Sequence, residues 1–230
     1  MASAHPPAET APPSFGLLLR EIGRIVDWRR TVAPRWHPDA VGGGRPVLVL
    51  PGFLASDTST RSLRQALREA GFIAYGWGQG RNFGLRPDTL PRVDALVTRL
   101  AERHGGPVAL VGWSLGGLIA REYAKQAPDR VAQVVTLGSP FSGDIHANNA
   151  WRLYELVARH KVDAPPLPLS LAEKPPVATT AIWSRRDGVV AAACARGEAG
   201  ERDRAVEVGC GHIEMVYTPE AQRAVIAALA

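Results

Sequence analysis

The segment Val108–Gly117 passes without a break from an apolar stretch into a glycine-rich turn. Residues 108–111 are all apolar, Gly112-Trp-Ser-Leu-Gly116 follows at once, and residues 115–126 read as a helix. An uninterrupted apolar run is typical of a strand that is buried on both faces of a parallel sheet. A strand that turns directly into a helix is a building block of α/β folds, so this segment alone favours that fold class.

Short apolar runs and helical patterns alternate along most of the chain. Runs that predict strands cover residues 47–50, 72–77, 108–111, 131–137, 177–183 and 205–208. Patterns that predict helices cover residues 62–70, 91–104, 115–126, 151–160 and 219–229. Strands and helices at this spacing predict a three-layer α/β fold, with a mainly parallel sheet of about six strands covered by helices on both faces.

The two ends of the chain differ in character. Residues 1–44 are expected to comprise a disordered tail, an amphipathic helix and a linker, whereas residues 45–230 form one α/β domain with a short cap insert at about 141–176. The apolar positions of the N-terminal helix follow helical spacing at Phe15, Leu18, Leu19, Ile22 and Val26. We expect this face to pack on the domain; a membrane interface, suggested by the neighbouring arginines, is the alternative.

Composition limits the classes of function. Hydrophobic residues make up 46% of the 230 residues and charged residues 21%, which is ordinary for a globular protein. No stretch approaches the roughly 20 uncharged apolar residues of a membrane span. The N-terminus lacks the pattern of a secretory signal, so we expect a cytoplasmic protein. The net charge of +5 comes mainly from dispersed arginines, and we expect no nucleic-acid partner.

The two cysteines, Cys194 and Cys210, are too few for a zinc site, and no CxxC pair is present. A disulfide between them is an alternative, but two free thiols are the expected state in the cytoplasm. We expect neither a metal nor a cofactor.

Ser114 is the candidate nucleophile. It lies between Gly112 and Gly116 on the turn that joins a strand to a helix, and glycines at these positions avoid collisions with a serine in a strained conformation. The turn should lift the hydroxyl above the carboxyl ends of the strands. It should also aim the Leu115 N–H at the reacting oxygen.

A serine hydroxyl needs a base to become a good nucleophile. His212 is the histidine that follows the last predicted strand, and Asp187 lies just past the fifth; both fit the order Ser, Asp, His. Asp163 and Asp203 are weaker alternatives for the acid. The Phe53 N–H, after the first strand, is expected to be the second donor to an oxyanion.

Residues for substrate binding are expected near the same edge of the sheet. We assign this role to Trp77, Asn82, Trp113 and Phe141. The alternative for the glycine-rich segment 76–84 is an ordinary turn in which Trp77 belongs to the core. Apolar residues of the insert should cover an acyl pocket, namely Trp151, Leu153, Tyr154, Leu156 and Val157.

Together these residues resemble the α/β-hydrolase superfamily over about residues 45–230. The segments 51–57, 76–82 and 138–141 are similar to those of compact bacterial lipase- and esterase-like hydrolases. The resemblance implies a serine hydrolase that cleaves carboxylic esters or lipids through an acyl-enzyme. Amide, thioester or acyl-transfer chemistry by the same three residues, or a non-catalytic ligand receptor, are the alternatives. Pro51, where many esterases have histidine, and the short cap leave the substrate open.

Overall fold

Strand β3 (Val108–Trp113) is buried along its whole length inside a parallel sheet. The computed structural model describes residues 11–24 and 41–230. Within them six strands, all parallel, lie in the order β2-β1-β3-β4-β5-β6. The sequence predicted about six strands in a mainly parallel sheet. The other strands are β1 (Pro46–Leu50), β2 (Ile73–Gly76), β4 (Val131–Leu137), β5 (Ala178–Trp183) and β6 (Arg204–Glu207).

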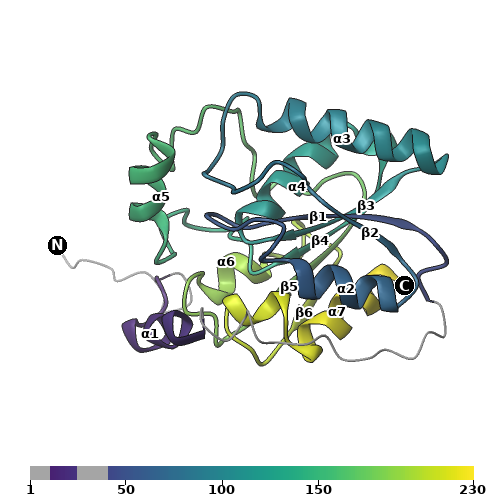
Figure 1. Cartoon of the computed structure of the whole chain (residues 1–230). Helices are drawn as coiled ribbons and strands as arrows, with labels where there is room; N and C mark the ends of the chain where they lie inside the picture. The colour runs from purple at the N-terminus through teal and green to yellow at the C-terminus, as the bar shows by residue number, and fades with distance from the viewer. Residues whose placement is uncertain (1–10, 25–40) are drawn as a thin grey trace.

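Helices cover both faces of the sheet (Figure 1). Val47 and Val49 of β1 pack in the core beneath α2 and α7, whereas Leu48 and Leu50 pack beneath α3 and α4. This split follows from the two-residue period of a strand. The helices are α1 (Phe15–Arg24), α2 (Arg61–Glu69), α3 (Thr89–His104), α4 (Leu115–Gln126), α5 (Trp151–Ala158), α6 (Ala192–Arg196) and α7 (Pro219–Leu229), with 3₁₀ turns η2 (Pro128–Arg130) and η3 (Ile213–Val216).

The strand order changes direction between β1 and β3. The chain runs from β1 outward to β2 and then returns to place β3 on the other side of β1, with Leu50 beside Gly112 in the register. Ligands of open α/β sheets bind in the crevice that such a reversal leaves at the carboxyl ends of the strands. The loop after Leu50 and the turn after Trp113 therefore meet at one place.

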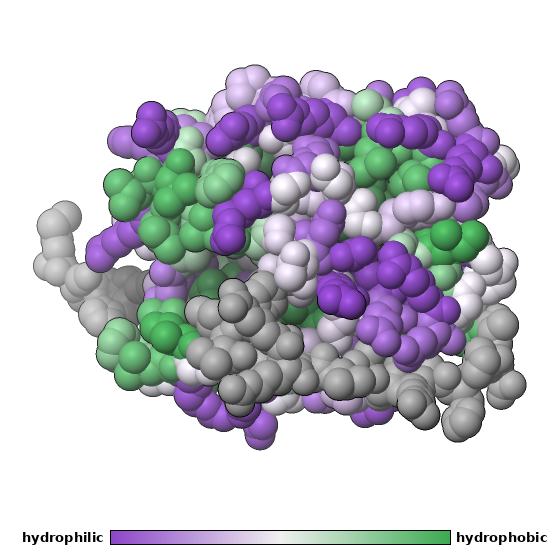
Figure 2. Space-filling model, in the orientation of Figure 1, coloured by the Kyte–Doolittle hydropathy of each residue, from purple (hydrophilic) through white to green (hydrophobic). Residues whose placement is uncertain are grey.

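Helix α1 contacts the domain through a different face from the one predicted. Its apolar residues Phe15, Leu19 and Ile22 are 70%, 52% and 54% exposed, whereas Glu21 is only 3% exposed. The expectation that the apolar face packs inward is wrong for these three residues, and Val26 lies outside the described residues. Figure 2 shows green patches over α1 and α5, to which Leu153 and Leu156 contribute on α5. No helix in the described ranges is both long and apolar enough to cross a bilayer.

Arg121, in the middle of α4, holds the end of the insert against the domain. Its guanidinium lies 4.0 Å from the centre of the Phe141 ring and is almost fully buried. Its Nη2 donates to the carbonyl oxygens of Leu171, Glu173 and Glu201 at 3.0–3.3 Å. Burial lowers the pKa of Arg121 to about 10, so the group stays charged at neutral pH. One side chain of α4 therefore satisfies three loop carbonyls.

Replacing Arg121 by alanine should leave these carbonyls without partners and open a cavity beside Phe141. We expect Arg121→Ala to lower the free energy of unfolding by about 2–4 kcal/mol, measured by urea denaturation. Arg61→Ala, at an exposed position of α2, is the control and should change it by less than about 0.5 kcal/mol. Equal effects of the two substitutions would contradict the anchoring role.

Candidate active site

The turn after β3 holds Ser114 in a conformation that side chains rarely adopt. Its φ is 53° and its ψ −121°, and its N–H donates to the carbonyl of Leu137 at 2.7 Å. A side chain at Gly112 would strike the backbone of Gly116, and one at Gly116 would strike the carbonyl of Leu50. The glycines therefore allow β1, β3 and α4 to approach closely enough to form this turn.

His212 and Asp187 form a buried pair. The His212 Nδ1 lies 2.7 Å from Asp187 Oδ2, and both side chains are almost fully buried. Asp187 Oδ1 accepts hydrogen bonds from the N–H groups of Val189 and Val190 at 2.8 and 2.7 Å. Because Asp187 is an acceptor on both oxygens, Nδ1 of the ring is the donor, which leaves Nε2 with the free lone pair.

The pKa of His212 reflects opposing effects. Burial alone lowers it, but the charge and hydrogen bond of Asp187, with a further contribution from the charge of Glu21, raise it above the ordinary 6.5. A raised pKa in the folded state means that protonation of His212 adds stability below pH 6.5. This contribution is lost as the pH rises through the folded-state pKa.

Gly138, directly after β4, makes room for the pair. Its φ is +55°, and a Cβ there would lie 2.8 Å from His212 Nδ1 and 3.0 Å from Asp187 Oδ2. Sequence reasoning used Gly138 only as part of a resemblance and did not give it this role. The available signal was a glycine at the carboxyl end of a predicted strand, beside the positions of the other site residues.

Two contacts bring the serine turn and the histidine loop together. The indole N–H of Trp113 donates to the His212 carbonyl at 3.1 Å, and the two rings lie 5.7 Å apart. The Ser114 N–H donates a hydrogen bond to the carbonyl of Leu137, and the next residue, Gly138, lies beside the His212–Asp187 pair. Ser114 follows β3, Asp187 follows β5 and His212 follows β6, and Gly138 after β4 lies beside the His212–Asp187 pair.

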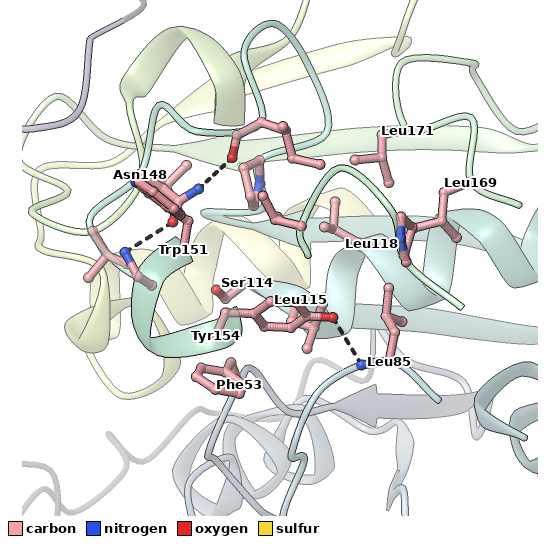
Figure 3. A pocket seen from close by; sticks show the side chains of 17 residues that line it. Phe53, Leu85, Ser114, Leu115, Leu118, Asn148, Trp151, Tyr154, Leu169 and Leu171 are labelled. Carbon is pink, nitrogen blue, oxygen red and sulfur yellow. Dashed lines mark hydrogen bonds between the residues drawn. The ribbon is translucent and has the colours of Figure 1, made fainter. Parts of the chain in front are cut away.

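Ser114 lines an apolar cavity that opens to solvent and has about 650 Å³ of space including its mouth (Figure 3). Trp151 and Tyr154 of α5 form part of its wall, as predicted, but Leu153 and Leu156 are exposed. The remaining wall residues are Phe53, Leu85, Leu115, Leu118, Pro140, Ile145, Asn148, Ala150, Val162, Pro165, Leu169, Leu171, Val189 and Val190. Tyr154 is fixed by the Leu85 N–H, which donates to its hydroxyl at 3.1 Å, and burial raises its pKa to about 12.

The two expected oxyanion donors lie in this wall. Phe53 and Leu115 both line the cavity beside Ser114, and a Cβ on Gly52 would lie only 3.1 Å from the Ser114 Cβ. Within residues 11–24 and 41–230, the N–H groups of Phe53 and Leu115 donate to no other backbone group. In this part of the chain neither N–H group is therefore taken up by a backbone carbonyl.

None of the four residues assigned to substrate binding lines the cavity. Trp77 is buried in the core, and its indole N–H donates to the Gly80 carbonyl. Asn82 is buried and donates to the Pro51 carbonyl, which fixes the loop that carries Phe53. Trp113 supports the His212 loop, and Phe141 lies under Arg121. Asn82 and Trp113 therefore contact loops of the site without lining the cavity, whose wall is formed by the residues named above.

The cysteines do not take part in this arrangement. Cys194 and Cys210 are both free and buried, and burial raises the pKa of each thiol, that of Cys210 to about 12. Asp203, a weaker candidate for the acid, instead accepts hydrogen bonds from Thr179 and pairs with Lys174. In the described residues no group of three or more His, Cys, Asp or Glu side chains is placed to hold a metal ion.

The sequence profile described as alpha/beta hydrolase fold matches residues 45–164, more than half of the chain. The chain belongs to the α/β-hydrolase fold family. The match begins one residue before β1 and includes the Ser114 turn and helix α5. The loops that carry Asp187 and His212 in this α/β hydrolase follow β5 and β6 and lie beyond the matched region.

Similar proteins include esterases. A pimeloyl-[acyl-carrier protein] methyl ester esterase of Nitrosomonas europaea is 34% identical over 107 residues, which cover 45% of this chain and 40% of that protein. A protein of the same description from Aliivibrio salmonicida is 42% identical over 59 residues, 26% of this chain and 22% of the relative. The chain therefore matches less than half the length of these relatives.

Solved structures are similar over most of the chain. One belongs to a pair of metagenome-derived lipolytic enzymes, with a TM-score of 0.58, 20% identity and coverage of 86% of this chain and 98% of the other. A carboxylesterase of Bacillus subtilis has a TM-score of 0.51 at 16% identity, with 85% of each chain covered. At these identities the likeness shows the shared fold.

The geometry makes a prediction about His212. In Asp187→Asn the ring loses the neighbouring negative charge while it stays buried, so we expect its pKa to fall by roughly 1–3 pH units. Titration of the imidazole Cε1–H signal by NMR measures this change. Asp129→Asn, at an exposed position after α4, should leave the pKa in place. An unchanged pKa in Asp187→Asn would contradict the pairing.

Proposed function

We propose that this α/β hydrolase is a serine hydrolase that cleaves carboxylic esters with Ser114, His212 and Asp187 as its catalytic residues. The observation that carries the proposal is the position of Ser114, a strained serine in the wall of an apolar cavity and next to two available backbone N–H groups. A buried histidine–carboxylate pair at the same edge of the sheet supplies the base. Relatives named as esterases support the reaction class.

The first half of the reaction forms an acyl-enzyme. Nε2 of His212 takes the proton of the Ser114 hydroxyl as its oxygen attacks the ester carbonyl carbon. The carbonyl π electrons move to the oxygen, which accepts hydrogen bonds from the N–H groups of Phe53 and Leu115. Asp187 stabilises the imidazolium. The C–O bond to the alcohol then breaks, and the leaving oxygen takes the proton from Nε2.

The second half returns the enzyme to its starting state. Water gives a proton to Nε2 as its oxygen attacks the acyl carbon, and the same two N–H groups hold the negative oxygen. The bond to Ser114 breaks, the serine oxygen recovers the proton from His212, and the carboxylic acid leaves.

The cavity favours an apolar acyl group. Apart from Ser114 and Asn148, its wall consists of apolar and aromatic side chains. Figure 3 places Leu169 and Leu171 at the opposite end from Asn148 and Trp151, with Ser114 between. An acyl chain attached to Ser114 would bury its apolar surface along Leu118 toward Leu169, at about 0.8 kcal/mol per buried CH₂.

Hydrolysis of p-nitrophenyl esters from acetate to palmitate tests the reaction. The full chain should turn them over with an optimum at one acyl length, and Ser114→Ala should reduce kcat at least about 10³-fold because the attacking oxygen is gone. Its far-UV and near-UV circular dichroism should match the unaltered protein. Turnover retained by Ser114→Ala would contradict the assignment, and a chain that neither hydrolyses esters nor reacts with a fluorophosphonate would favour the ligand-receptor alternative.

A substitution in the wall tests where the acyl chain lies. Leu169→Trp fills the distal end of the cavity, so the preferred acyl chain should become shorter while kcat on the acetate ester stays within about twofold. Leu156→Trp, on the exposed side of α5, is the matched control and should leave the preference in place. The same optimum in both variants would place the acyl chain elsewhere.

A further inference from the structure

Glu21 is a buried carboxylate on helix α1, outside the domain that carries the proposed catalytic residues. It is 3% exposed, and its side chain accepts hydrogen bonds from three backbone N–H groups. Its Oε1 accepts from Gly188 at 3.0 Å and from His212 at 2.6 Å, and its Oε2 accepts from Ile213 at 2.9 Å. A buried charge is costly unless hydrogen bonds compensate it, and these three do so.

The three donors belong to the two loops that carry the acid and the base. Gly188 follows Asp187 in the chain, and the second donor is the N–H of His212 itself. One carboxylate therefore joins the loop after β5 to the loop after β6, directly behind the 2.7 Å contact between His212 Nδ1 and Asp187 Oδ2. Glu21 is not among the residues that line the cavity, so we expect it to act through the two loops that it binds.

Two glycines make room for this carboxylate. A Cβ at Gly211 would lie 2.5 Å from Glu21 Oε1, and a Cβ at Gly188 would lie 2.8 Å from Glu21 Cγ and would strike the backbone of Leu17. Both loops are therefore shaped to receive α1. This close approach explains why glycine stands next to Asp187 and next to His212 in these two loops.

Contacts on either side of Glu21 keep α1 in place. The Asn149 side chain donates to the carbonyls of Pro13 and Gly188 at 2.9 and 2.8 Å. Arg24 forms an ion pair with Glu214 at 3.5 Å. Figure 1 shows α1 at the same end of the sheet as α5, which forms part of the cavity wall.

We propose that Glu21 is a positioning residue that sets the geometry of the His212–Asp187 pair by binding the backbone of both loops at once. The proposal rests on the proposed function of this pair in ester hydrolysis. It gives a role in the reaction to helix α1, which lies outside residues 45–164, the region that the family profile matches.

The charges around His212 make the role of Glu21 measurable. The Glu21 carboxylate adds to the charge of Asp187 and opposes the effect of burial on the His212 pKa. Charged and titratable groups lie on each element packed around the ring. Asp187 and Arg186 follow β5, and Arg186 donates to the Gly209 carbonyl. Glu21 and Arg24 lie on α1. Cys210 precedes the ring, Glu214 on η3 accepts from the Gly211 N–H, and Glu220 on α7 accepts from the Gly209 N–H.

Two variants of the full chain separate charge from position. In Glu21→Gln the amide oxygen can still accept from Gly188 and His212, but the charge and the third acceptor are lost. We expect the NMR-titrated pKa of His212 to fall and kcat on the optimal ester to drop several-fold. In Glu21→Ala all three bonds are lost, and kcat should drop between about 10- and 100-fold because small displacements of catalytic groups have such effects. KM should stay within about twofold in both.

Glu102→Gln provides the matched control, because it removes one exposed carboxylate from the last turn of α3, which leads to the amino end of β3. The pKa of His212 and kcat should match those of the unaltered chain. If Glu21→Gln and Glu21→Ala lower only the melting temperature and leave both quantities in place, Glu21 is a structural brace and the proposal is overturned. If Glu21→Ala does not fold, Glu21→Gln still decides.

The titration also separates this proposal from the proposed function. The His212 signal titrates whether or not the protein hydrolyses an ester. An unaltered chain without turnover would overturn the ester assignment, whereas the pKa difference between that chain and Glu21→Gln would still show whether Glu21 acts on His212. Equal pKa values in the two proteins would overturn the Glu21 proposal even when esters are hydrolysed.

Discussion

The backbone of Ser114, held at a φ of 53° between β3 and α4, is the constraint on which the other parts of the site depend. A serine adopts this strained conformation only where its neighbours leave room. A side chain at Gly112 would collide with the backbone of Gly116, and one at Gly116 would collide with the carbonyl of Leu50, so both positions need glycine. The turn places the hydroxyl at the reversal of the strand order, beside the loop after β1. Its N–H bond to Leu137 then ties it to β4 and so to Gly138 beneath the His212–Asp187 pair.

The rest of the site is built by elements that brace one another through polar groups. Arg121 fixes the end of the insert, and its partners are backbone carbonyls. Glu21 binds the loops of Asp187 and His212, and its partners are backbone N–H groups. In a sheet, backbone carbonyl and N–H groups form hydrogen bonds with the neighbouring strand. Loops have no such neighbour, so the buried charged side chains of Arg121 and Glu21 form hydrogen bonds with these backbone groups instead. Both charges fix loop positions more strictly than apolar packing would, because their acceptors and donors have defined directions.

Strand and helix positions were largely predictable, because long apolar runs and helical spacing survive in the structure: residues 115–126, 131–137 and 219–229 match their elements end to end. The five residues of α6 were too short to show a period. The order of the strands predicted that Ser114, Asp187 and His212 lie at one edge of the sheet, and the structure pairs His212 with Asp187. Glu21 was missed because a lone carboxylate on an amphipathic helix reads as solvent-facing. Trp77 and Phe141 were misplaced because sequence locates a loop but not which way its side chains point.

The central claim is that Ser114 is the group that becomes acylated. Incubation of the full chain with a fluorophosphonate, followed by peptide mass spectrometry, tests it most directly, because the reagent bonds only to a serine made nucleophilic by its surroundings. The account predicts one adduct per chain, on the peptide that contains Ser114, and much slower labelling when His212 is replaced by alanine. An adduct on another residue, or no adduct on the unaltered chain, would contradict it.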